Sequence, residues 1–138
     1  MLGGCGTVEL GDNIVPPDLM LDEDFFYCRI QPEIIEAHGC AGGAAGEMGM
    51  CHTSRSALRL VETMDLAPPT CVDDVVEGAV PAEYVENFQA VQFTVQSDPL
   101  SSPFYRRPVG LDSHPRVIFS ETSPEADLVS MWIARGGL

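Results

Sequence analysis

The stretch of sequence that decides the fold is DEDFFYCRIQPEIIEAH, residues 22–38. Its acidic start, residues 22–24, suits the first turn of a helix, where the helix dipole favours negative charge. Apolar side chains then follow at nearly helical spacing. Pro32 lacks the backbone N–H that a helix interior needs, so we expect a kink or two abutting helices there. We expect the element to end near residues 38–39, because glycine suits a helix C-cap.

Two more helices are expected downstream of this stretch. One covers residues 81–92, where a proline suits the first turn and the apolar side chains share one face. The other begins after an N-cap at Ser123 and ends near Arg135, before two glycines. The 24 glycines and prolines of the chain indicate long connections between few short elements. The predicted fold class is therefore mainly α: a small helical domain over residues 22–138 with long ordered loops.

The charge of the chain restricts its partners. There are 21 acidic residues and seven basic ones, all arginine, for a net charge of −14. Such a surface repels nucleic acid, so a DNA or RNA partner is not expected. It can attract basic redox proteins, or it can serve solubility alone. No hydrolase motif and no phosphate-binding glycine loop is present, and we do not expect an enzyme.

The N-terminus carries a short motif of its own. The run Leu2-Gly3-Gly4-Cys5 resembles the lipobox of bacterial lipoproteins, in which the cysteine becomes the lipid-bearing N-terminus. Residues 1–21 then read as a lipobox followed by a flexible tether. The resemblance implies a lipid anchor at Cys5 and a place in the bacterial cell envelope, periplasmic or at the outer membrane.

The segment that carries chemistry is Cys40, ten further residues, and then Cys51-His52. In the usual c-type haem signature, C-x-x-C-H, two thiols bind the haem vinyl groups and the adjacent histidine binds the iron. The longer spacer here changes the entropy of loop closure by about 1 kcal/mol, which is small beside a covalent bond. This spacing is therefore compatible with haem attachment.

A wider resemblance surrounds this segment. The chain resembles the cytochrome c-like domains common in planctomycetes and myxobacteria, which combine a V-x-P-I-L helix, a Cys…Cys-His haem site and a G-L-R-L segment. Their ending, S-x-L-L-x-K-P…H…F…W-I-x-x-G, is also similar. The matching pieces here are FYCRIQPEII (26–35), Cys40, Cys51-His52, LRL (58–60), SPFYRRP (102–108), His114, Phe119 and WIARG (132–136).

This resemblance implies a monohaem electron-transfer protein. Cys40 and Cys51 would hold one covalent haem c, and His52 would be the proximal iron ligand. His114 stands where the family pattern has its histidine, which makes it the favoured second axial ligand; the alternative is an ordinary loop histidine. The partners would be redox proteins or other subunits of an envelope complex.

With two thiols assigned to haem, Cys28 and Cys71 remain. A disulfide between them would tie the first helix to a distant loop and stabilise the fold by about 3–4 kcal/mol. A second hypothesis is a haem-free interaction lipoprotein with this disulfide and a Cys40–Cys51 disulfide, or another of the three pairings that four cysteines allow. A third is a zinc site of Cys28, Cys40, Cys51 and His52, which needs reduced thiols and so conflicts with the lipobox.

Overall fold

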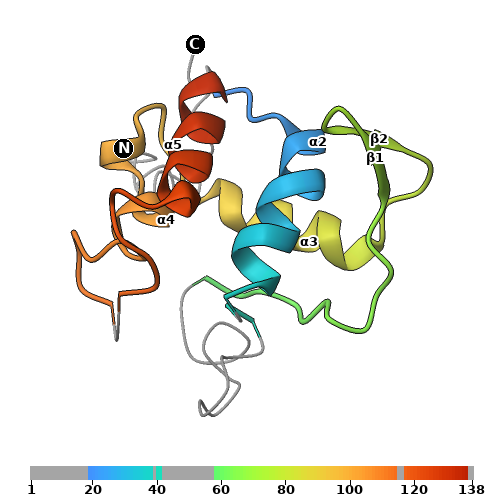
Figure 1. The fold of residues 1–138 in the computed structure, drawn as a ribbon, viewed down its shortest axis with the longest axis horizontal. Coiled ribbons are helices and arrows are strands. Elements are labelled where there is room, and N and C mark those ends of the chain that lie inside the picture. Colours follow the sequence, from blue (N-terminus) through green and yellow to red (C-terminus); the bar gives the residue numbers. More distant parts are fainter. Residues whose placement is uncertain (1–18, 39, 42–57, 115–116, 137–138) are drawn as a thin grey trace, which may run out of the picture.

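The computed structural model describes residues 19–38, 40–41, 58–114 and 117–136 (Figure 1). The first helix, α2 (Glu23–Phe25), passes directly into a π-helix, η1 (Phe26–Glu36). A hairpin of β1 (Thr70–Val72) and β2 (Val75–Glu77) comes next, followed by α3 (Ala82–Gln92). A 3-10 turn η2 (Pro99–Ser101), α4 (Pro103–Arg106) and α5 (Pro124–Gly136) complete the described chain. None of these helices is both long and apolar enough to cross a bilayer.

The prediction of a mainly α fold is wrong. Helices make up 45% of the described residues, and the fold is a small mix of helices with a two-stranded antiparallel sheet. The chain after Pro69, which was expected to be a loop, forms this hairpin, and its turn is Asp73-Asp74, without the glycine that usually marks a two-residue hairpin turn. Both aspartates have positive φ, 51° and 64°, as the tightest hairpin turns require, and aspartate tolerates this backbone better than most residues. The β-branched side chains on either side favour the strands.

The first helical element differs from expectation at its proline. Its N-terminus is capped as the acids indicate, since the Asp22 carboxylate accepts a hydrogen bond from the Phe25 N–H at 3.1 Å. The helix does not break at Pro32 but continues as a π-helix to Glu36. The Pro32 carbonyl accepts a hydrogen bond from the Ala37 N–H at 3.2 Å. An eleven-residue π-helix is long for this geometry, which usually occurs as a single-turn bulge.

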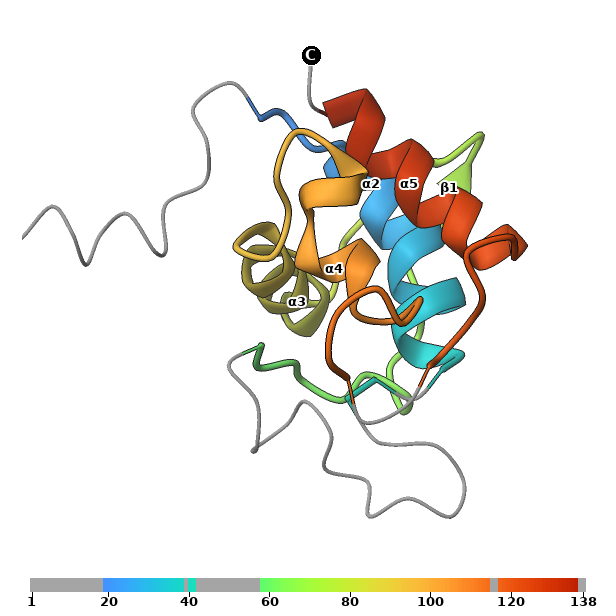
Figure 2. The same ribbon diagram turned by 90° about the vertical axis from the view of Figure 1, so that its left-hand side faces the viewer.

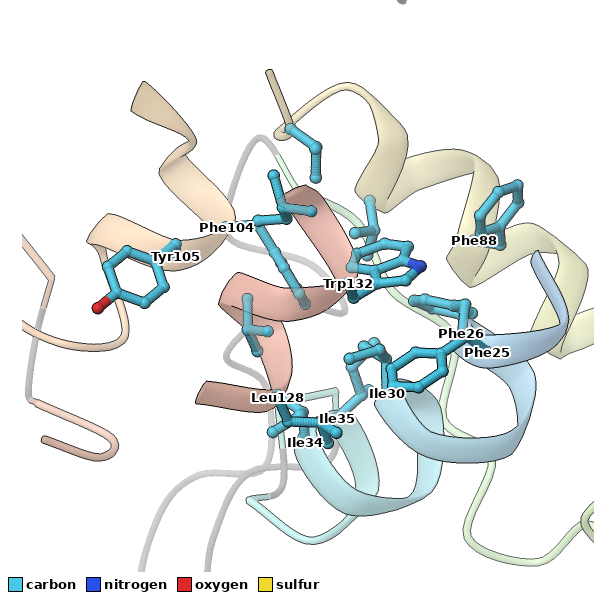
Figure 3. Close-up of a cluster of buried hydrophobic side chains, with 14 of the residues drawn as sticks. Phe25, Phe26, Ile30, Ile34, Ile35, Phe88, Phe104, Tyr105, Leu128 and Trp132 are labelled. Atoms are coloured by element: carbon cyan, nitrogen blue, oxygen red, sulfur yellow. The ribbon is translucent and has the colours of Figure 1, made fainter. Parts of the chain in front are cut away.

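The core lies where η1, α3 and α5 meet (Figure 3). The ring of Phe26 lies 5.5 Å from that of Trp132 and 5.4 Å from that of Phe88, measured between centroids. Phe104 of α4 contacts the other side of Trp132 at 6.0 Å. The indole N–H of Trp132 donates to the Asp22 carbonyl at 3.0 Å. The first and last helices therefore pack directly on each other.

The end of α5 also holds the first described residues. The Met20 N–H donates to the Gly136 carbonyl at 2.8 Å. A Cβ atom at position 136 would lie 3.0 Å from the Cα atom of Leu21. Only glycine allows this close approach, because at that distance a larger residue requires the backbone to shift.

Candidate functional site

The predicted haem residues divide between the described chain and the rest. Cys51 and His52 lie outside the described residues, as does Cys5, the proposed lipid anchor. Cys40 and His114 lie within them, and both are half-buried. The structure therefore describes the frame on either side of the Cys51-His52 segment.

Cys40 follows the C-terminal end of η1. Its backbone N–H donates to the Ile35 carbonyl at 2.9 Å, and its Sγ lies 3.7 Å from the Ile34 carbonyl oxygen. Its side chain packs against the hydrophobic core. The helix end thus fixes the position of this thiol.

Cys28 and Cys71 form a disulfide that joins η1 to β1, with their Cα atoms 6.0 Å apart. This is the pairing that the haem hypothesis left for them, and Cys40 lies outside it. A disulfide sulfur is not the thiolate that zinc needs, so the zinc set containing Cys28 is overturned. In the part of the chain that the structure describes, no three metal-ligating side chains gather elsewhere.

The segment after residue 57 is held by Asn87 of α3. The Asn87 Oδ1 accepts from the Val61 N–H at 2.7 Å, and its Nδ2 donates to the Val61 carbonyl at 3.0 Å. Asn87 is fully buried, and its Nδ2 also donates to Gln31 of η1 at 3.0 Å. The Asn87 side chain therefore joins the backbone at Val61 to both α3 and η1.

A second set of buried polar contacts lies beside the first. Thr63 accepts from Gln31 at 2.8 Å, and its hydroxyl donates to the carboxylate of Glu36. The Tyr84 hydroxyl donates to the same carboxylate at 3.0 Å. Burial raises the pKa of Tyr84 well above its usual value, and its hydrogen bond to Glu36 and the charge of that carboxylate raise it further. Tyr84 therefore remains a donor at physiological pH.

These buried polar residues were not predicted from the sequence. A signal for one of them is present: Asn87 comes three positions after Tyr84, on the face of the helix that is otherwise apolar. A polar side chain at such a position needs a buried partner. The sequence does not say that the partner is the backbone at Val61, because 26 residues separate the two.

His38 connects the end of η1 to the loop before α5. Its Nε2 lies 3.4 Å from the Glu125 carboxylate, and its ring centroid lies 5.4 Å from that of Phe119. His114 belongs to the loop that this contact secures. Figures 1 and 2 both place the end of η1, the chain leaving residue 58 and this loop towards one end of the molecule. Three described segments of the predicted site region thus lie towards the same end of the molecule.

A groove of about 440 Å³ runs between η1 and the start of α5. Its lining is mostly apolar, with three charged side chains: Arg29, Glu33 and Glu125. Two of these pair with each other, and the third pairs with His38. All three charged side chains of the groove are therefore already paired with other side chains.

The two described candidate residues, Cys40 and His114, carry the thiol and the imidazole that the haem hypothesis needs. Of the described cysteines, Cys40 is the one that lies outside the Cys28–Cys71 disulfide. Comparison of the chain with protein-family models, with curated proteins and with solved structures found no match.

Proposed function

We propose that this chain is a lipid-anchored electron-transfer protein of the bacterial cell envelope with one covalent haem c. The observation that carries the proposal is the separation of the cysteines. Cys28 and Cys71 are joined to each other, and Cys40, which follows the end of η1 and precedes the Cys51-His52 segment in sequence, lies outside this disulfide. A thioether-bound haem requires this division, and the haem-free alternative with a Cys40–Cys51 disulfide shares it.

Each residue of the proposed site has one role. Cys40 and Cys51 would bind the two vinyl groups, His52 would bind the iron, and His114 would be the second axial ligand. The haem, when bound, supplies a one-electron redox centre. Two described residues that flank the Cys51-His52 segment in sequence are held in place, Cys40 by η1 and Val61 by Asn87.

The envelope location rests on the lipobox resemblance and has one further support. Disulfides persist in oxidising compartments such as the bacterial periplasm and are rare in the cytosol. A Cys28–Cys71 disulfide therefore agrees with a place outside the cytoplasm. The strongly acidic surface suits docking to basic redox partners.

The proposal is tested by the visible spectrum of the protein, expressed in the periplasm of a bacterium that matures c-type cytochromes. We expect a Soret band that remains with the polypeptide after denaturation. Cys40→Ala removes one attachment point and lowers the haem yield. Cys28→Ala/Cys71→Ala, the matched control, keeps the haem. A colourless protein from these cells, with Cys40 joined to Cys51, would overturn the proposal.

A second candidate is the haem-free interaction subunit, and the packing of the core favours it. Trp132, Phe26, Tyr84 and Ile30 are all fully buried, and the core of the described chain is filled by its own side chains. No buried polar side-chain atom of the described residues lacks a hydrogen-bond partner. Such a scaffold can be stable without a cofactor, and the same spectrum separates the two candidates.

A further inference from the structure

The β1–β2 hairpin is fixed rigidly to the helices. The disulfide at Cys71 ties β1 to η1. The guanidinium of Arg29 lies 3.5 Å from the carboxylate of Asp74 in the turn. The Val76 N–H, on the outer edge of β2, donates to the Asp24 carboxylate at 3.2 Å. The hairpin is therefore held from its turn, from β1 and from β2, and Figure 1 shows it on the side of α2 and η1 opposite to α5.

The outward face of this hairpin carries no covering element within the described chain. Cys71 pairs with Val76 in the register, and both side chains are half-buried towards the helices. Val72 pairs with Val75 on the opposite face, and these two side chains are 50% and 53% exposed. Directly opposed side chains on one face of a sheet contact each other, so the two valines form one small apolar patch.

The surroundings of this patch are acidic. Between Arg59 and Arg106 the sequence has eight acids and no lysine, arginine or histidine. Asp73 and Glu77 are exposed on the hairpin itself. The nearest described base is Arg29, which contacts the carboxylates of Glu33 and Asp74. The patch is thus apolar at its centre and negative around it.

We propose that the outward face of the β1–β2 hairpin, centred on Val72 and Val75, docks a basic surface of a partner protein. Charge complementarity selects this occupant. Nucleic acids and anionic lipid surfaces carry the same sign of charge as this face and are repelled. A protein surface with lysine or arginine around an apolar side chain matches both its centre and its edge.

The structure also indicates the kind of complex. A rigid hairpin loses little conformational entropy on binding. A single hairpin face buries less area than a permanent interface, so the contact is weak and short-lived. Its charges are exposed, so its affinity falls as salt rises. The inference does not depend on haem and stands or falls separately from the function proposed above.

The test is an amide-shift titration of the ¹⁵N-labelled full chain. The probe is a short peptide in which lysine and leucine alternate, and the control is the glutamate–leucine peptide. We expect shift changes confined to residues 70–77 and their contacts on η1, smaller at higher salt and absent with the acidic peptide. Equal changes over all acidic parts of the surface, or none at all, would overturn the proposal.

Two pairs of substitutions separate the apolar and charged contributions. Val72→Ser/Val75→Ser lowers the affinity for the basic peptide about five-fold at every salt concentration. Asp73→Asn/Glu77→Gln lowers it at low salt and flattens its salt dependence. Asparagine tolerates the positive φ at position 73, so this pair leaves the turn intact.

Matched controls lie on α5 and just before it, away from the hairpin. Met131→Ser removes another exposed apolar side chain, and Glu121→Gln/Asp127→Asn removes two other exposed charges. Neither control changes the affinity if the hairpin is the docking surface. If the control variants weaken binding as much as the hairpin variants do, the peptide is attracted by the overall negative charge and not by the hairpin face, and the proposal is overturned.

Discussion

The two ends of η1 are held in different ways. Its start is fixed by the Asp22 cap, by the packing of Phe26 against Trp132 and by the disulfide at Cys28, which lies in its first turn. At its other end, Glu36 and His38 make polar contacts to three separate segments. The Cys28–Cys71 disulfide is thus at the start of η1, beside the β1–β2 hairpin. The polar contacts of Glu36 and His38 are at the other end, beside Cys40. The second end is the one that precedes the proposed haem-binding segment in sequence.

The largest expected effect comes from removing the aromatic packing between Phe26 and Trp132 at the start of η1. Trp132→Ala deletes a fully buried ring and its hydrogen bond to the Asp22 carbonyl. We expect a loss of about 3–5 kcal/mol in the free energy of unfolding, measured by urea denaturation. Met131→Ala, at the next and exposed position, is the control and costs less than about 0.5 kcal/mol. A loss below about 1 kcal/mol for Trp132→Ala would contradict the packing described here.

The disulfide is expected to contribute almost as much. Cys28→Ser/Cys71→Ser opens a connection across 43 positions and lowers the free energy of unfolding by about 3–4 kcal/mol. Hydrogen exchange should rise first in the hairpin, because its remaining links, Arg29–Asp74 and Val76–Asp24, are single contacts. Unchanged exchange in residues 70–77 would show that the disulfide does not fix the hairpin.

One substitution among the buried polar contacts, at Asn87, is expected to lower the free energy of unfolding strongly. Asn87→Ala removes the hydrogen bonds that Asn87 makes to the N–H and carbonyl of Val61 and to the amide oxygen of Gln31, at a cost of about 2–3 kcal/mol. Gln89→Ala, exposed on the same helix, is the control and is close to neutral. Urea denaturation measures both, and equal stability of the two variants would show that Asn87 is not an anchor.

The smallest effect is a pH dependence. Burial and the contacts with Glu36 raise the pKa of Tyr84 above its ordinary value of 10.0. The folded state therefore holds this proton more tightly than the unfolded state. That stability is fully present below about pH 10 and is lost as the pH rises above it.

Tyr84→Phe is the variant that tests this pH dependence. It should make the fall in stability above about pH 10 shallower, since one titrating group is removed. Urea denaturation between about pH 8 and pH 11 measures the slope. A slope identical to that of the unaltered protein would show that Tyr84 is not the group involved. Tyr27, whose pKa is also raised by burial and by Glu23, continues to contribute in both proteins.

The helices with clear local signals were predictable from sequence. The expected helix over 81–92 is α3, Ala82–Gln92. The expected N-cap of the last helix is present, because the Ser123 hydroxyl accepts from the Ala126 N–H at 3.1 Å. Capping residues and a regular apolar face act within a few residues, so a local pattern is sufficient to reveal them.

The hairpin and the buried polar contacts could not be predicted in the same way. Strands of three residues are too short to show a period, and this hairpin owes its position to Cys28, Arg29 and Asp24, more than 40 residues earlier. The attachment of Val61 to Asn87 is also a tertiary contact. The spacing of Cys40 and Cys51 predicts a site, but the residues that frame it come from α3 and η1.

The most direct test of the central proposal is the mass of one tryptic peptide. Cleavage after Arg29 and Arg55 releases residues 30–55, which contain Cys40, Cys51 and His52 and no other cysteine. For protein matured in the periplasm with haem available, we expect this peptide to carry the added mass of one haem. A peptide without haem that is lighter by two hydrogens, from a Cys40–Cys51 disulfide, would contradict it.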